Sequence, residues 1–549
     1  MLMVILNWLY ILFTVFFLGY GIFCWTEKTL GYRMKYISSV LMAGLVGATV
    51  YAQVFSLFHG VGMAANITLL GICLATAVIC RKRLPADIRN FYQDCPMFKK
   101  GILMVLFFVW AYFTSRGYIH YDSDLYHAQS IRWIEEYGVV KGLGNLHERF
   151  AYNSSVFAVS ALYSMKFLFG RSLHTISGFF AFLLSIKVLD AISWKMRTKK
   201  LLVSDFARMG AVYYLTTICD EVVSPASDYA TMCVIFYIVI QWLDALENEK
   251  LSSEVSYAYL CICGVYTMSL KLTAALILIL LFKPAYALLK KRRLREIMLY
   301  LGMGTLVILP WFIRTVIISG YLIYPFPALD IFSVDWKMDV QKVIVDAKNI
   351  KAWGKALYDT NLADMPITSW FANWFQSTLS STEKLLILAD MISILGILLF
   401  MLWIIVKKKK QYGDILLVLL AVGASWIFWQ TNAPLLRYGY AYVLLLPAIL
   451  AGTLFASFQR YRLIFLAVAM YGAYKLYVTA GYAWSIGYEQ YYVSQKDYGS
   501  YELHRLEIDG ITFYTPVSGD RTGYEFFPAA PNVEITLRGE TLQGGFLHP

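Results

Sequence analysis

A short stretch of the chain combines carboxylates with imidazoles. Asp122 and Asp124 lie in YIHYDSDLYHAQS, where His120 and His127 flank them, and His147 follows further along. Carboxylates and imidazoles are common general bases, and together they also bind divalent cations. The segment therefore predicts either a general base at Asp122 or Asp124, or a Mg²⁺ or Mn²⁺ site whose candidate ligands are Asp122, Asp124 and His127.

Helix capping is the simpler explanation for one of these acids. Asp122 and Ser123 stand where the N-cap of the following helix belongs, and Asp and Ser are preferred caps. A cap accounts for one polar residue but not for the whole group. Apolar residues recur at every third position after it, which predicts an amphipathic helix along the membrane surface: Leu125, Ala128, Ile131 and Ile134.

Three cations form a second candidate group. Lys271, Arg314 and Arg437 each fall near the same end of an apolar segment. Any one of them could extend to the lipid headgroups, which is the ordinary behaviour of long basic side chains. Together they would suit a lipid phosphate, because Arg makes paired contacts with phosphate oxygens and Lys supplies a point charge.

Two other outer loops carry further candidates. In DEVVSPASDY, Asp228 at the entry to an apolar segment is a better site candidate than Asp220 or Glu221, which solvent would satisfy. A later loop is rich in aromatic residues that could stack on sugar rings, although a membrane interface has the same composition. Its tryptophans are Trp336, Trp353, Trp370 and Trp374.

The elements that must position these residues are transmembrane helices. Of 549 residues, 59% are hydrophobic and 15% are charged, and apolar stretches recur up to about position 480. A span needs roughly 20 such residues. The net charge of +12 comes from short basic clusters between the stretches, which is typical of the positive-inside rule and speaks against a nucleic-acid partner.

Hydropathy predicts an all-α polytopic fold with about 14 spans. The segments on either side of Lys271 are only half-length, so Lys271 would stand at a break between two helices. The predicted spans are 3–23, 37–57, 62–80, 99–115, 173–194, 202–219, 229–246, 256–269, 272–288, 296–318, 384–406, 413–430, 438–457 and 462–479.

The basic clusters orient these spans within a membrane domain of residues 1–479. They place the N-terminus outside and give two large outer loops, 116–172 and 319–382. Residues 156–169 within the first loop are too short to span, so we expect an interfacial or re-entrant helix. The tail, 480–549, would also lie outside as a small strand-containing cap over the membrane domain.

The acidic pair in the first large outer loop, followed by interfacial helices and many spans, resembles the GT-C superfamily of glycosyltransferases. A second resemblance covers most of the chain and is to a family of uncharacterised bacterial multi-spanning membrane proteins. It rests on YDSDLYHAQSIRWIEEYGVVKGLGNLHERFAYNSS, RTVIISGYLIYPF, GDRTGYEFFPAAP and LRGETLQGGF. The chain departs from the best-known GT-C members in the spans before the acidic loop and shows little sign of their large soluble C-terminal domain.

The GT-C resemblance implies a sugar donor carried on polyprenyl phosphate and a glycan, lipid or protein acceptor. Asp122 or Asp124 would then serve the acceptor hydroxyl as base or metal ligand. Arg437, in RYGY, resembles the basic residue that such enzymes place near the donor phosphate. The bacterial resemblance implies a multi-pass protein of the inner (cytoplasmic) membrane, with its active side facing the periplasm or exterior and a role in cell-envelope polysaccharide biosynthesis.

Three other functions stay open. A transporter or flippase for lipid-linked glycans would line a path through the membrane midplane with charges. A glycan polymerase or ligase would also work outside, but would depend mainly on Arg and His and would tolerate loss of Asp122 and Asp124. A membrane scaffold would tolerate loss of both the acids and the cations.

Overall fold

Long apolar helices dominate the protein. The computed structural model describes residues 1–191, 201–456 and 491–548, and a few positions between 470 and 481. Within these residues, nine helices are long and apolar enough to cross a membrane, and a pair bent by 93° makes up to ten. The protein is therefore an integral membrane protein that spans the bilayer several times, as predicted.

The described helices follow the predicted spans closely. Those that pass the length and hydropathy criteria are α1 (Leu2–Leu30), α2 (Ile37–Ser56), α5 (Met97–Ser115), α13 (Ser227–Glu247), η3 with α15 (Leu272–Leu281 and Phe282–Lys290), α16 (Leu294–Ser319), α19 (Ser381–Lys407), α20 (Gly413–Asn432) and α21 (Leu436–Phe455). The bent pair is α3 (Met63–Ile79) with α4 (Leu84–Gln93).

The total of fourteen spans stays a prediction. Three other predicted spans coincide with helices that are shorter than the nine membrane-spanning candidates. These are α10 (Ile176–Leu189), α12 (Val203–Ile218) and α14 (Glu254–Leu270). The predicted span at 462–479 lies mostly outside the described residues.

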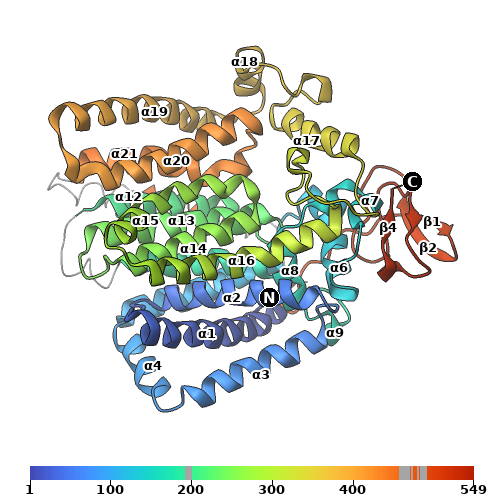
Figure 1. Cartoon of the computed structure of the whole chain (residues 1–549), viewed down its shortest axis with the longest axis horizontal. Helices are drawn as coiled ribbons and strands as arrows, with labels where there is room; N and C mark the ends of the chain where they lie inside the picture. The colour runs from blue at the N-terminus through green and yellow to red at the C-terminus, as the bar shows by residue number, and fades with distance from the viewer. Residues whose placement is uncertain are drawn as a thin grey trace.

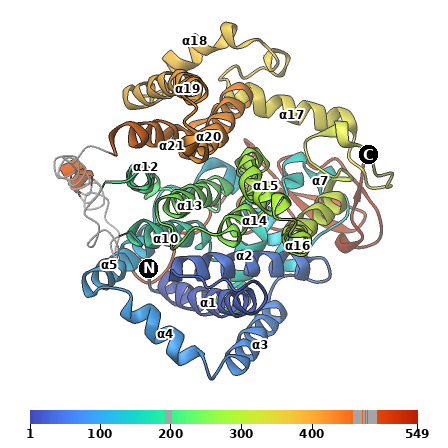
Figure 2. The ribbon, with the colours of Figure 1, turned by 60° about the vertical axis from the view of Figure 1, so that its left-hand side comes forward.

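Helix α13 is the centre of the bundle. It packs against α10, α12, α14 and α21. In its most apolar stretch 94% of the residues are buried, against 22% in that of α19. Both views place α1–α4 along one side of the central helices and α19–α21 along the other (Figures 1 and 2). A helix that is apolar on every side must be covered either by protein or by lipid, so α19 is a peripheral helix that faces lipid.

Small residues let α1 and α2 pack backbone to backbone. A Cβ on Gly19 would lie 1.9 Å from the carbonyl oxygen of Val40, and one on Gly44 would lie 1.8 Å from that of Val15. Transmembrane helices associate through such close contacts because lipid removes the hydrophobic driving force between them. This pair fixes α2, whose far end accepts a hydrogen bond from the Val139 amide through the Ser56 carbonyl.

Short helices and the tail gather at one end of the bundle, with α7, α17 and the strands together at the right of Figure 1. The helical elements here are η1 (Ser123–His127), α6 (Ala128–Glu136), α7 (Leu143–Leu146), η2 (Glu148–Ala151), α8 (Ser155–Tyr163), α9 (Lys166–Phe169), η4 (Pro327–Leu329), α17 (Val340–Gly354), η5 (Thr360–Leu362) and α18 (Ile367–Ser377). Helix α8 is buried along its whole length. It therefore lies inside the protein and not along a surface.

The described part of the tail contains two small antiparallel sheets. Strand β1 (Leu503–Ile508) pairs with β2 (Ile511–Pro516), and β3 (Thr536–Leu537) pairs with β4 (Phe546–Leu547), so the tail contains strands as predicted. The tail covers α6, because Gln129 donates to the carbonyl oxygens of Gly523 and Phe526. Seven of the nine residues of α6 are buried, so this helix lies between the membrane domain and the tail.

Candidate functional site

Arg437 joins two carboxylates that are far apart in the sequence. Its Nη2 donates to Oδ2 of Asp122 at 2.5 Å, and its Nε lies 3.5 Å from Oδ2 of Asp228. The guanidinium also donates to the ring of His120, 2.8 Å from Nδ1. Arg437 therefore links the segment between α5 and α6 to α13.

Lys271 extends this arrangement on the other side of Asp228. Its Nζ makes an ion pair with Oδ1 of Asp228 and lies 3.2 Å from the ring centroid of Tyr438. Tyr438 also accepts a hydrogen bond from Nη2 of Arg437 at 3.1 Å. One carboxylate and one tyrosine thus hold the two cations side by side.

Arg149 completes the group. Its Nη1 lies 3.7 Å from Oδ1 of Asp122. We call Arg437, Lys271, Arg149, Asp122, Asp228 and His120 the charge cluster. Among the described residues, the three cations of the charge cluster share Asp122 and Asp228 as ion-pair partners. Asp228 is buried, whereas about a fifth of the Arg437, Asp122 and Lys271 side chains is exposed, so solvent reaches these three side chains.

The ends of three membrane helices position the cluster. Asp228 is in the first turn of α13 and Arg437 is in the first turn of α21. Lys271 is the extended residue between α14 and η3, which is the break that the half-length segments predict. Helix N-termini carry a partial positive charge, so α13 and α21 add to the attraction for an anion.

These contacts set the ionisation of Asp122 and His120. Burial is the largest influence on the pKa of Asp122 and alone would raise it, but the charge and hydrogen bond of Arg437, together with His127 and His120, lower this pKa to about 2. Burial, helped by Arg437, lowers the pKa of His120. At neutral pH the cluster therefore presents a carboxylate at Asp122 and a neutral imidazole at His120.

The segment after Asp122 begins with a π-helical turn and not with a capped α-helix. Residues 123–127 form a π-helical turn in which the Ala128 amide donates to the Ser123 carbonyl, and Asp122 makes no capping hydrogen bond. Such turns are frequent at functional sites. His127 is buried, its Nδ1 is 3.3 Å from Oγ of Ser123, and burial lowers its pKa to about 3. The capping explanation of Asp122 is thus not supported.

Asp124 does not face the charge cluster. Its Oδ1 accepts from the Gly499 amide at 2.9 Å and its Oδ2 from the Tyr501 hydroxyl at 2.8 Å. Its carbonyl oxygen also accepts from the Thr522 and Gly523 amides. Asp124 therefore holds the tail, and the two acids of the DSD motif have different surroundings.

Arg314 and His147 also lie outside the cluster. Arg314 is buried, where its Nε donates to Oδ1 of Asn153 at 3.0 Å and its Nη1 donates to Ser56. His147 accepts from the Arg149 amide at 3.1 Å through Nδ1, which caps the short helix η2. His147 thus helps to position Arg149, a residue of the cluster that the sequence analysis did not identify.

The remaining candidates lie elsewhere at this end. Asp220 pairs with Arg116, while Glu221 accepts from the Tyr229 hydroxyl at 2.7 Å, and burial raises the Glu221 pKa. The tryptophans divide between structural and exposed positions. Trp370 and Trp374 are buried in α18, Trp336 donates to a carbonyl oxygen of α16, and Trp353 is more than half exposed.

Within the described residues, no three His, Cys, Asp or Glu side chains are arranged to hold a metal ion. Asp124 turns toward the tail and away from Asp122, which separates two of the three candidate ligands.

Comparison with known proteins gives a family but no activity. Neither the curated proteins nor the solved structures contain a match to this chain. One family model, described as a domain of unknown function, matches residues 1–444, which include every member of the charge cluster. The chain therefore belongs to the family of the domain of unknown function DUF8201.

Proposed function

We propose that the protein is a membrane-embedded glycosyltransferase of GT-C type. It transfers a sugar from a polyprenyl-phosphate carrier to an extracytoplasmic glycan, lipid or protein acceptor in the assembly of a bacterial cell-surface glycan. The observation that carries the proposal is the contact of Arg437 with Asp122 and Asp228 beside Lys271, at one end of the membrane helices.

The cluster offers an exchangeable site for a phosphate. A phosphate oxygen can replace a carboxylate oxygen on a guanidinium with the same paired geometry. When the donor phosphate takes Arg437 and Lys271, Asp122 loses its strongest cationic partner. The pKa of Asp122, which Arg437 lowers in the free protein, then rises and makes this carboxylate a better base.

The transfer uses the carboxylate of Asp122 and the two cations Arg437 and Lys271. The acceptor oxygen forms a bond to the anomeric carbon while the bond from that carbon to the phosphate oxygen breaks. The acceptor proton passes to Asp122, and the bonding electrons leave with the phosphate, whose growing charge Arg437 and Lys271 stabilise. A positioned general base typically contributes about 10²–10⁴-fold to such a reaction.

Binding of a carrier tests the first step directly. Purified protein in lipid nanodiscs is titrated with polyprenyl monophosphate, and bound lipid is counted by native mass spectrometry. We expect Lys271→Met to weaken binding by about tenfold or more, which corresponds to roughly 1.4 kcal/mol. Lys351→Met is the matched control, because Lys351 is an outer lysine of α17 that pairs with Asp364. Equal binding by both variants would contradict the proposal.

A glycan polymerase or ligase is the second candidate, and the contact of His120 with Arg437 favours it. Such an enzyme would use those two residues without a carboxylate base. Full activity of Asp122→Asn together with loss of activity in His120→Ala would decide for this alternative.

A flippase gains less support. Buried charged residues do lie inside the bundle near the end of α13, where Lys187 binds Asp244 at 2.9 Å and Arg208 binds Asp244 at 2.6 Å and Asp205 at 3.6 Å. Because these charges neutralise one another, they account for helix packing without a transported ligand.

A further inference from the structure

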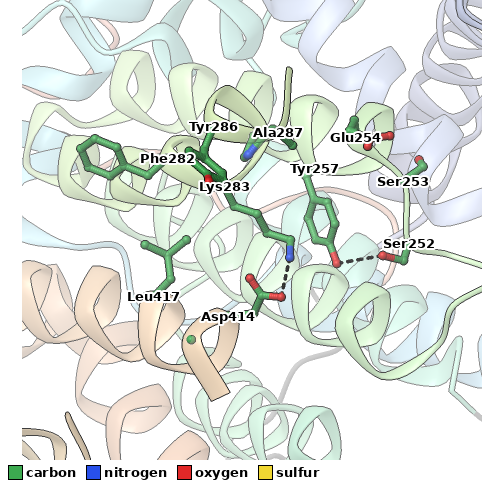
Figure 3. A pocket seen from close by; sticks show the side chains of 12 residues that line it. Ser252, Ser253, Glu254, Tyr257, Phe282, Lys283, Tyr286, Ala287, Asp414 and Leu417 are labelled. Carbon is green, nitrogen blue, oxygen red and sulfur yellow. Dashed lines mark hydrogen bonds and ion pairs between the residues drawn. The ribbon is translucent and has the colours of Figure 1, made fainter. Parts of the chain in front are cut away.

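A cavity of about 700 Å³ opens at the other end of the bundle from the charge cluster. It lies between the first turns of α14 and α20 and the start of α15 (Figure 3). Helix α14 has 17 residues and runs from Glu254 at this cavity to Leu270 beside Lys271. At 1.5 Å per residue the two sites are roughly 25 Å apart, so they are separate sites.

The wall of the cavity combines a lysine with hydroxyls and carboxylates. Lys283 makes an ion pair with Asp414 at 2.6 Å, and its Nζ lies 4.8 Å from the ring centroid of Tyr257 (Figure 3). Ser252 lies 3.3 Å from the Tyr257 hydroxyl. About half of Asp414 is exposed, so this ion pair is at the mouth of the cavity and open to exchange.

Lysines pair with both acids of the cavity. Lys283 binds Asp414, and Lys291, directly after α15, makes an ion pair with Glu254. Further cations follow in the sequence after the lining residues of α15: Lys290, Arg292 and Arg293. Clusters of this kind beside membrane helices attract acidic lipid headgroups.

Two aromatic residues place the mouth of the cavity at the membrane boundary. Phe282 and Tyr286 line it, and about 70% of each side chain is exposed. Exposed aromatic rings at the end of a membrane helix are typical of the interface between headgroups and acyl chains. A lipid can therefore enter sideways, with its chains against the rings and its headgroup in the cavity.

We propose that this cavity binds an anionic phospholipid whose headgroup carries hydroxyls, such as phosphatidylglycerol. The lipid phosphate replaces Asp414 on Lys283. The headgroup hydroxyls donate to the Glu254 and Asp414 carboxylates and interact with Ser252. This assignment explains why the cavity combines lysines with two acids, because an anion without hydroxyl groups would leave those acids opposed to it.

The positive-inside rule explains the basic residues but not the cavity. Topology requires only that cations lie in the loops. It does not require Lys283 to lie against Tyr257 and Asp414. It also does not require a cavity, and the volume of this one is within the range of small-molecule sites. The cavity is therefore the feature that a test must address.

Lipid binding to the delipidated, intact protein tests the assignment. Dioleoyl phosphatidylglycerol is titrated in detergent and the bound lipid is measured by native mass spectrometry, with dioleoyl phosphatidylcholine and water-soluble glycerophosphoglycerol as comparisons. We expect phosphatidylglycerol to bind about tenfold more tightly than either. Lys283→Met should abolish this preference. Asp414→Asn should keep or strengthen binding, because it frees Lys283.

Lys82→Met is the matched control, because Lys82 is exposed in another basic loop and does not line the cavity. The proposal is overturned if Lys82→Met and Lys283→Met weaken binding equally, which would mean diffuse attraction. Equal binding of phosphatidylcholine would also overturn it, as would equal binding of the soluble headgroup. If Lys283→Met does not fold, a loss of binding in the folded Asp414→Asn variant overturns the proposal.

Discussion

The guanidinium of Arg437 donates to the carboxylate of Asp122 at 2.5 Å across 315 positions of sequence. This contact ties the start of α21 to the loop between α5 and α6. Asp228 and Lys271 surround it from α13 and from the break after α14. Four parts of the chain thus fix the position of the Arg437 guanidinium, which the proposed transfer needs in order to hold a phosphate in one orientation.

Replacement of Arg437 should abolish activity even when the charge is kept. Arg437→Lys loses the fork that reaches Asp122 and Asp228 together, so we expect at least about a hundredfold loss in transfer, or roughly 2.7 kcal/mol. Arg132→Lys is the matched control, because Arg132 binds the carbonyl oxygens of Tyr524 and Glu525 in the tail. Near-normal transfer by Arg437→Lys in a labelled-sugar assay would count against the site.

The two acids of the DSD motif should separate in their effects. Asp122→Asn should stop transfer while leaving the tail protected, because Asp122 contacts the cluster. Asp124→Asn should weaken docking of residues 498–524, because Asp124 accepts from Gly499 and Tyr501. Hydrogen exchange measured by mass spectrometry, together with transfer activity, checks both variants. Identical phenotypes would show that the motif acts as a unit.

Asp122 and Asp124 face different partners for a geometric reason that follows from their spacing in the sequence. Residues two apart on a helix differ by about 200°, so Asp122 and Asp124 cannot face one ligand from a regular helix. The π-helical turn could not be predicted, because hydrophobic periodicity does not distinguish it from an α-turn. That turn places the ring of His127 where it interacts with the charge of Asp122.

Some other parts of the site could be predicted from the sequence and some could not. The helical spans and the break at Lys271 follow from hydropathy, which reports on the lipid solvent. Arg149 was not identified because its position depends on a short helix capped by His147, which has no periodic signal. Arg314 lies near a helix end, as Lys271 and Arg437 do, but its partner Asn153 comes from a loop that hydropathy cannot place.

Gly499 should be essential for docking of the tail. A Cβ at this position would lie 2.6 Å from the Tyr501 hydroxyl and 2.8 Å from Oδ2 of Asp124. Gly499→Ala should therefore expose the tail to limited proteolysis, whereas Gly539→Ala, with its nearest neighbouring atom at 4.0 Å, should not. Equal cleavage rates in both variants would contradict this docking geometry.

The contact between α1 and α2 predicts a large difference between two glycines. Gly19→Leu must separate the helices, because its Cβ would overlap the Val40 carbonyl, whereas Gly71 has open space around it. We expect Gly19→Leu to cost about 3 kcal/mol or more and Gly71→Leu much less. Thermal unfolding in detergent measures both. A similar midpoint for the two variants would disprove the packing.

Asp346 should make stability depend on pH. Burial raises its pKa to about 6, although the Tyr152 and Tyr324 hydroxyls donate to it. A raised folded-state pKa contributes stability that is present below the unfolded value, about 3.9, and is lost as the pH rises through 6. The loss is at most about 3 kcal/mol. Asp346→Asn should flatten this part of the stability profile between pH 4 and 7, and an unchanged slope would refute the assignment.

The most direct test is a mass-spectrometric profile of glycans and lipid-linked sugars in cells that lack the protein. The deletion is complemented with wild type, Asp122→Asn or Asp124→Asn at matched expression. The account predicts that one sugar is missing, that its lipid-linked donor accumulates, and that Asp122→Asn fails to restore the profile. An unchanged profile in the deletion strain, or full restoration by Asp122→Asn, would contradict a transferase whose base is Asp122.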